Sequence, residues 1–191
     1  MRVRDCPRLG TVPRWTDGGQ SPGYARIVVG VDPPASVGGT CGIVVCARET
    51  GADPRAVVLD DASIGGASPE RWARAVAAVA ERWGADRVVV EANQGGDMVT
   101  SVLRAACPTL PIRAVHAARG KAARAEPVAT LFESGRAVFA GHFAALEAQL
   151  AGMTIEGYEG PDRSPDRADA MVWAVTELSE SKSGVPRIRA L

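Results

Sequence analysis

The chain has 191 residues, of which 46% are hydrophobic and 23% charged, a composition typical of one globular domain. Its 22 basic residues balance 22 acidic residues, so binding to nucleic acid or to an anionic membrane must come from a local patch. No apolar run is long enough to span a membrane and no secretory signal is recognisable, so we expect a cytoplasmic protein whose four cysteines are reduced.

Proline and glycine are frequent near both ends of the chain. Residues 1–25 contain three prolines and several glycines without hydrophobic periodicity, and residues 181–191 are similar. We therefore expect a linker or disordered tail over 1–25, one domain over 26–180 and a flexible C-terminal tail over 181–191.

Three short apolar runs at the start of this domain predict β-strands. They cover residues 27–31, 42–46 and 56–59, and turn residues separate them, so antiparallel hairpins fit. The first run stops at Asp32, which two prolines follow.

Helices then alternate with strands. Apolar residues at helical spacing predict a helix from the N-cap Ser68 to Gly84. A strand ending at Glu91, a helix from about Asp97 and a strand over 112–115 follow. Three antiparallel strands followed by two strands with helical crossovers predict an α/β fold, with a mixed five-stranded sheet flanked by helices.

The last third of the domain is predicted to be mostly helical. The expected elements are a helix beginning at Glu126–Pro127, a short extended segment at 137–139, a helix near 142–150, a loop over 153–161, and a last helix capped by Ser164 and running to about Leu178.

Four carboxylates stand at unusual positions. Asp32 and Glu91 end strands, and they meet at one sheet edge if those strands are parallel neighbours. Asp166 and Asp169 are three residues apart on the last helix and share a face that could lie over this edge. Converging carboxylates need cations to stay ionised together, and hard oxygen ligands suit Mg²⁺ or Mn²⁺. Two such ions, about 3.5–4 Å apart, commonly serve phosphodiester hydrolysis.

Each carboxylate alone also has a purely structural explanation. Asp32 before proline is a common turn residue, Glu91 is a suitable cap for the next helix, and Asp166 suits the dipole of a first helical turn. The combination is more specific than any member.

Four blocks of sequence occur in a fixed order, at residues 29–36 with 42–45, 88–96, 119–136 and 164–174. Together they resemble the C-terminal nuclease domain of tailed-bacteriophage large terminases, and the resemblance extends over about residues 26–177. It implies an RNase H-like fold. Large terminases also carry a packaging ATPase, but this chain has no G-x-x-x-x-G-K-S/T motif, so motor activity is not expected.

The resemblance implies a metal-dependent endonuclease that cleaves double-stranded, concatemeric viral DNA during genome packaging, with two divalent cations, Mg²⁺ or Mn²⁺. Asp32, Glu91 and Asp169 take the places of the family's catalytic, metal-binding carboxylates, and Asp166 that of an auxiliary ligand. The implied partners are DNA, a terminase ATPase domain or subunit, the small terminase and the portal, with no membrane. The implied location is the cytoplasm of a phage-infected or prophage-carrying bacterium.

The stretch between residues 113 and 124 holds four basic residues, a histidine and no acid. We expect it to border the same cleft and to hold the DNA backbone through Arg119, Lys121 and Arg124, because the family resemblance includes the residues around Lys121 and Arg124. The alternative is a solvated basic loop, because the chain carries 20 arginines and only two lysines. His116 fits either a general base or a structural role.

Asn93 and Gln94 are candidates for contact with the scissile strand, and a polar turn is the alternative. Trp72, Trp83 and Trp173 lie at core spacing and are expected only to pack. Two other functions stay open for the whole chain: a Holliday-junction resolvase of the same fold, and an inactive DNA-binding module.

Overall fold

Two long antiparallel strands, β1 (Tyr24–Asp32) and β2 (Thr40–Glu49), form the centre of the sheet. The structure is a computed structural model, and it describes residues 23–34, 38–93, 96–154 and 157–180. The strand order across the sheet is β6 (Ile112–Val115), β5 (Arg87–Glu91), β1, β2, β3 (Ala56–Asp61), β7 (Ala137–Phe139). The pairs β1–β2 and β2–β3 are antiparallel, whereas β5 with β1, β6 with β5 and β7 with β3 are parallel. The predicted mixed sheet is therefore confirmed.

Two short strands extend the sheet beyond the five that were expected. β4 (Ile64–Gly65) pairs with β2, and the extended segment at 137–139 joins the edge as β7. A small separate hairpin, β8 (Met153–Thr154) with β9 (Gly157–Tyr158), lies within the expected loop. The chain before residue 23 and after residue 180, where tails were predicted, lies outside the described residues.

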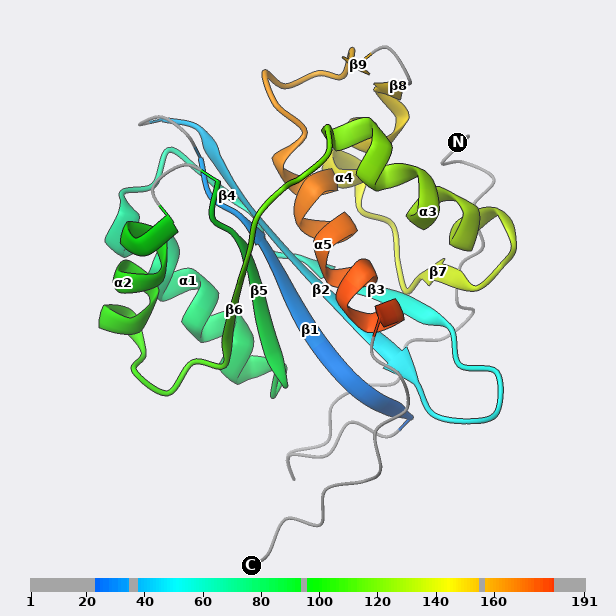
Figure 1. The fold of residues 1–191 in the computed structure, drawn as a ribbon, viewed down its shortest axis with the longest axis horizontal. Helices are drawn as coiled ribbons and strands as arrows, with labels where there is room; N and C mark the ends of the chain where they lie inside the picture. Colours follow the sequence, from blue (N-terminus) through cyan, green and yellow to red (C-terminus); the bar gives the residue numbers. More distant parts are fainter. Residues whose placement is uncertain (1–22, 35–37, 94–95, 155–156, 181–191) are drawn as a thin grey trace, which may run out of the picture.

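Helices cover both faces of the sheet (Figure 1). The helices α1 (Pro69–Arg82) and α2 (Gly96–Ala106) lie on one face, and α3 (Lys121–Glu133), α4 (Ala144–Ala151) and α5 (Asp166–Glu180) lie on the other. Ser68 caps α1 as predicted, because its side chain accepts a hydrogen bond from the Arg71 amide. No helix among the described residues is both long and apolar enough to cross a membrane.

The alternation of side chains along β1 supplies a core on each face. Val29 and Val31 pack with α1 and α2, whereas Val28 packs with the helices of the opposite face. Both sets are fully buried, which explains why the strand is an uninterrupted apolar run.

The helix α3 begins five residues earlier than expected. Pro127 was predicted in its first turn, but it lies inside a helix that starts at Lys121. Proline removes one backbone hydrogen bond from a helix interior, and here good helix formers precede it. Lys121 and Arg124, in the added first turns, also form ion pairs with other elements.

The helix α5 lies unusually close to the two central strands. An ideal Cβ at Gly30 would lie 1.9 Å from the carbonyl oxygen of Ala170, and one at Gly42 would lie 2.0 Å from that of Asp166. Glycine at these positions therefore lets the backbone of α5 rest directly on β1 and β2. This contact brings the start of α5 to the strand end that carries Asp32.

Candidate metal centre

Two carboxylates come from neighbouring parallel strands. Asp32 is the last residue of β1 and Glu91 the last residue of β5, and the register pairs Val31 with Val90 just before them. Because side chains alternate along a strand, Asp32 lies on the same face as Gly30, which contacts α5. The predicted meeting of Asp32 and Glu91 at one sheet edge is found.

The third carboxylate comes from the first turn of α5. Asp169 offers an oxygen that lies, with one oxygen each from Asp32 and Glu91, in a group whose members are all within 4.8 Å of one another. The convergence predicted from sequence is therefore present. Asp166 is not a member of this group; its carboxylate lies 3.9 Å from the ammonium of Lys121.

Burial makes this group costly to ionise. Asp169 is 0% exposed and Asp32 only 6% exposed. Loss of hydration raises the pKa of Asp32 to about 7, and the negative charge of Asp169 adds to the effect, while Lys121 opposes it. Burial likewise raises the pKa of Asp169 and of Asp166. The site therefore requires compensating positive charge.

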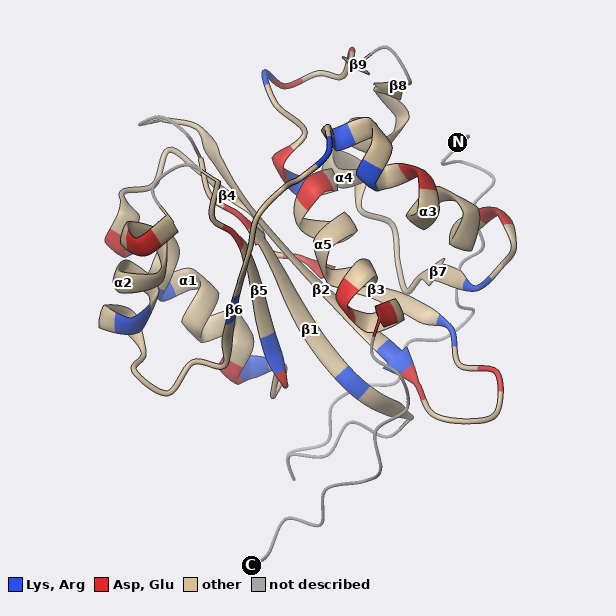
Figure 2. Ribbon diagram, viewed as in Figure 1, with Lys and Arg blue, Asp and Glu red and all other residues tan. Residues whose placement is uncertain are grey.

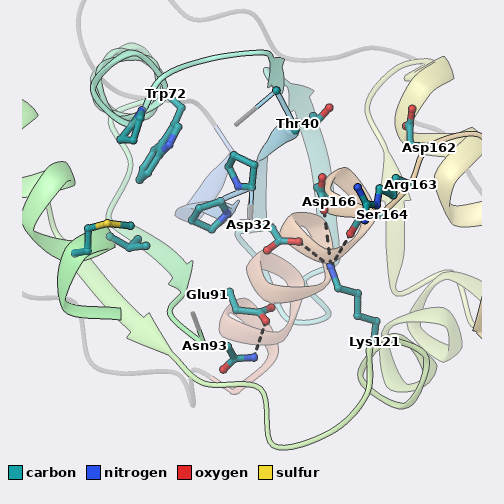
Figure 3. A pocket seen from close by; sticks show the side chains of 17 residues that line it. Asp32, Thr40, Trp72, Glu91, Asn93, Lys121, Asp162, Arg163, Ser164 and Asp166 are labelled. Carbon is teal, nitrogen blue, oxygen red and sulfur yellow. Dashed lines mark hydrogen bonds and ion pairs between the residues drawn. The ribbon is translucent and has the colours of Figure 1, made fainter. Parts of the chain in front are cut away.

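Lys121 supplies part of that charge from the start of α3. Its Nζ lies 3.0 Å from Oδ2 of Asp32 and 2.9 Å from Oδ2 of Asp169. Figure 3 shows the side chain reaching from α3 toward Asp32, Ser164 and Asp166. Burial alone lowers the pKa of Lys121, but the attraction of the carboxylates outweighs it and raises the pKa above its ordinary value.

Arg124 links the other two carboxylates. One of its terminal nitrogens lies 3.0 Å from Oε2 of Glu91, and the other lies 2.6 and 2.9 Å from the oxygens of Asp169. The basic residues at the start of α3 thus face the acidic start of α5 (Figure 2). Lys121 and Arg124, expected as DNA contacts, both form ion pairs with the carboxylates; the Arg124 side chain is 9% exposed, whereas the Lys121 side chain is 35% exposed and lines the cleft.

Trp173 does more than pack, so the expectation for it was wrong. Its indole Nε1 donates a 2.7 Å hydrogen bond to Oε2 of Glu91, and the guanidinium of Arg124 lies 4.7 Å from the ring centroid. Trp173 stands one helical turn after Asp169, so it lies on the same face of α5. That spacing is the signal in the sequence from which this role could have been inferred.

The remaining predicted contacts lie around the group. The Asn93 side chain donates to Oε1 of Glu91 and accepts from the Ala117 amide, both at 2.7 Å, so Asn93 orients Glu91 as part of a polar turn. Arg119 is exposed in the loop between β6 and α3, and His116 is exposed just after β6. Gln94 lies outside the described residues.

The start of α5 is held by residues that sequence reasoning missed. Oε1 of Gln149, in α4, accepts hydrogen bonds from the amides of Arg167 and Ala168 at 2.9 and 3.2 Å. The Arg167 side chain bonds both oxygens of Asp61 in β3, at 3.0 and 2.9 Å. Ser164, the predicted cap, instead accepts a bond from Lys121.

A cleft of about 880 Å³ opens beside the carboxylates (Figure 3). One wall is acidic and the opposite wall is largely apolar, with α1 and α2 contributing to the apolar side. Its lining includes Asp32, Glu91, Lys121, Asp166, Pro33, Trp72 and Met98. An open cleft with charged groups along one wall has room for an extended, charged substrate.

Comparison with solved structures gives the same fold. The large terminase nuclease of the thermophilic phage G20c with bound magnesium has a TM-score of 0.62 at 16% identity, covering 88% of this chain and 93% of that chain. The human cytomegalovirus terminase nuclease domain, manganese-soaked with bound inhibitor, has a TM-score of 0.60 at 15% identity, covering 87% of this chain and 89% of that chain. The nuclease domain of the large terminase subunit of bacterial virus Sf6 has a TM-score of 0.56 at 15% identity, covering 80% of this chain and 89% of that chain.

A search of curated proteins finds no match to the chain. In contrast, the sequence model of the terminase RNase H-like domain family matches residues 29–178. This range contains the strands of the sheet, apart from the first residues of β1, and the five helices, apart from the last residues of α5. The RNase H-like fold and the resemblance inferred from the sequence blocks are thereby confirmed, and the chain belongs to the terminase RNase H-like domain family.

Proposed function

We propose that this chain is a metal-dependent endonuclease that cleaves double-stranded, concatemeric viral DNA during genome packaging. One observation carries the proposal: Asp32, Glu91 and Asp169, which are far apart in sequence, place oxygens within 4.8 Å of one another at the edge of the sheet. Membership of the terminase RNase H-like domain family supports the same reaction.

The ligand set fits a hard divalent cation. All three groups are carboxylates, and no histidine or cysteine belongs to the group. Such oxygen ligands suit Mg²⁺ or Mn²⁺; the solved phage G20c nuclease has bound magnesium, and the cytomegalovirus nuclease domain was soaked with manganese. When bound, two such ions supply an activated water and stabilise negative charge on the leaving oxygen in phosphodiester hydrolysis. Asp32, Glu91 and Asp169 would hold them, with Asp166 as an auxiliary ligand.

The chain's own cations serve two different purposes in this proposal. The side chain of Arg124 is only 9% exposed and is held by Glu91, Asp169 and the Trp173 ring, so it fixes the two carboxylates. The side chain of Lys121 is 35% exposed and lines the cleft, so its ammonium can reach a DNA phosphate. Arg119, exposed in the preceding loop, extends this basic surface.

The packaging context extends the proposal beyond this domain. Residues 26–180 would form the nuclease, and a terminase ATPase domain or subunit, the small terminase and the portal would be its partners in the cytoplasm of an infected or prophage-carrying bacterium. Membership of the terminase RNase H-like domain family supports this assignment of roles.

Plasmid cleavage tests the proposal. Supercoiled plasmid is incubated with the chain and Mg²⁺, Mn²⁺ or EDTA, and nicked and linear products are measured. We expect cleavage with either metal, none with EDTA, and a loss of at least about 100-fold in Asp32→Asn or Asp169→Asn. Asp53→Asn, in the exposed turn between β2 and β3, is the control and should cut normally.

A four-way junction of equal length provides the second substrate. A packaging nuclease should cut the duplex at least as fast as the junction. Metal-dependent cutting that persists in both Asp32→Asn and Asp169→Asn would refute the proposed site, and a strong preference for the junction would refute the packaging role.

A further inference from the structure

We propose that Gln149 of α4 is a positioning residue for the carboxylate site, because its side chain fixes the start of α5 and thereby the place of Asp169. The consequence for metal binding rests on the proposed function. The hydrogen bonds of Gln149 are observed in the structure and do not depend on the proposed function.

Gln149 is a buried amide on the apolar side of a helix. It is 0% exposed, and its neighbours on α4, Leu146 and Leu150, are core residues. Burying an amide costs free energy unless its hydrogen bonds are made. Here Oε1 accepts from the amides of Arg167 and Ala168, and Nε2 donates to Asp162 at 2.6 Å and to the Ser164 carbonyl at 3.5 Å.

The two bonds to Oε1 replace a local helix cap. The first N–H groups of a helix have no partner within the helix, and usually a side chain just before it accepts from them. In α5 the acceptor comes from α4, 18 residues before Arg167. The start of α5 is therefore fixed relative to another helix, so its position depends on tertiary structure.

This anchor lies directly before a candidate metal ligand. Ala168, whose amide donates to Gln149, is followed at once by Asp169. From the sheet, Asp61 holds Arg167 through a two-oxygen ion pair. The first turn of α5 is thus held by α4 and β3, while Asp32 and Glu91 stand at the ends of β1 and β5. A shift of this turn would change the distances among the three carboxylates.

The contacts require a side chain that accepts on one side and donates on the other. Toward α5, Gln149 must accept from two amides, and toward Asp162 it must donate. A glutamate there would accept from the amides but would meet the Asp162 carboxylate as a second acceptor. Changing Asp162 to asparagine as well would restore a donor at that contact, which gives a rescue test.

Direct measurement of Mn²⁺ affinity by isothermal titration calorimetry on the full chain tests the proposal. Gln149→Met keeps the volume and removes the hydrogen bonds, and we expect it to weaken Mn²⁺ binding by about 10- to 100-fold, the range found for groups that orient metal ligands. Hydrogen exchange should accelerate at the amides of Arg167 and Ala168. Leu146→Ala, a buried change on the same helix, should lower the melting temperature without changing the affinity by more than about twofold.

Exchanging the amide of Gln149 and the carboxylate of Asp162 gives an independent test, again measured as Mn²⁺ affinity. Gln149→Glu should weaken Mn²⁺ binding, and Asp162→Asn alone should change it little because the glutamine still has an acceptor. The double variant Gln149→Glu/Asp162→Asn should regain an affinity within about threefold of the original, a coupling that a merely destabilising change would not produce. This cycle decides the question even if Gln149→Met does not fold.

Two results would overturn the positioning role. One is Mn²⁺ affinity in Gln149→Met equal to that of Leu146→Ala, and the other is a folded double variant that binds no better than Gln149→Glu. If the unaltered chain neither binds Mn²⁺ nor cuts DNA, the proposed function fails as well. Binding and cutting by the unaltered chain, with affinity insensitive to Gln149, would refute only the positioning role.

Discussion

Gly42 of β2 lies directly against the backbone of Asp166 in α5, so close that a Cβ on the glycine would be 2.0 Å from the Asp166 carbonyl oxygen. The obstacle is backbone, which cannot turn aside as a side chain would. A methyl group at Gly42 must therefore push the first turn of α5 away from the sheet, and that turn carries Asp169.

Gly42→Ala should consequently impair both stability and metal binding. Overpacking typically costs about 1–3 kcal/mol of unfolding free energy, measurable by urea denaturation. Mn²⁺ affinity should fall in the same variant. Gly65→Ala is the matched control, because its Cβ would meet the Thr40 hydroxyl at an ordinary 3.7 Å. Equal Mn²⁺ affinities in the two variants would contradict the view that close packing places Asp169.

The parts of the site that could be predicted are those fixed by local pattern. Asp32 and Glu91 each end an apolar run, so the strands and their parallel crossover were enough to bring them together. Asp169 was identified from its spacing of three residues from Asp166 on one face of the last helix, together with the family resemblance of residues 164–174.

The parts that could not be predicted depend on packing between distant elements. The early start of α3 places Lys121 and Arg124 at the carboxylates, but Pro127 suggested a later start. Ser164 was the expected cap of α5 because caps are usually local, whereas the observed acceptor is Gln149 on α4. For these contacts, the pattern within one segment does not reveal which other segment it meets.

The indole of Trp173 should matter for the site through its hydrogen bond to Glu91. Trp173→Phe keeps an aromatic ring beside Arg124 but removes the 2.7 Å bond, so Glu91 becomes freer to rotate. We expect Mn²⁺ affinity to fall by about tenfold, with little change in melting temperature. Trp83→Phe removes a comparable bond, to Asp60 at 3.2 Å, on the α1 side of the sheet and should leave affinity unchanged. Unchanged affinity in Trp173→Phe would show that Glu91 is oriented without it.

Arg119 should contribute a phosphate contact that salt weakens. Arg119→Gln, made in the Asp169→Asn background so that DNA is bound without being cut, should lower the slope of log affinity against log salt by about 0.9, the value for one lost phosphate contact. Arg136→Gln removes the same charge from an exposed residue just past the far end of α3 and should leave the slope unchanged. Fluorescence anisotropy with a labelled duplex at several salt concentrations measures both. Identical slopes for the two variants would mean that Arg119 does not contact DNA.

Of the four cysteines, the three that lie among the described residues should differ sharply in reactivity in the folded chain. Cys41 and Cys46 are fully buried, and loss of hydration raises the pKa of both thiols, so the reactive thiolate is scarce. Cys107 is partly exposed and lies just after the end of α2. Iodoacetamide at pH 8 should therefore modify Cys107 in the native chain. The modification of Cys41 and Cys46 should be on the order of a thousandfold slower, because exposing these thiols requires opening of the core.

Peptide mass spectrometry of timed samples separates the sites, and a sample unfolded in guanidinium shows that all three thiols can react. Cys41 immediately precedes Gly42, so its protection also reports on the packing that places α5. Rapid native modification of Cys41 with continued protection of Cys46 would mean that the end of β2 nearest the carboxylates opens independently of the rest of the sheet. In that case the site would not be held rigidly by its glycine contacts, and Gly42→Ala should lose much of its expected effect.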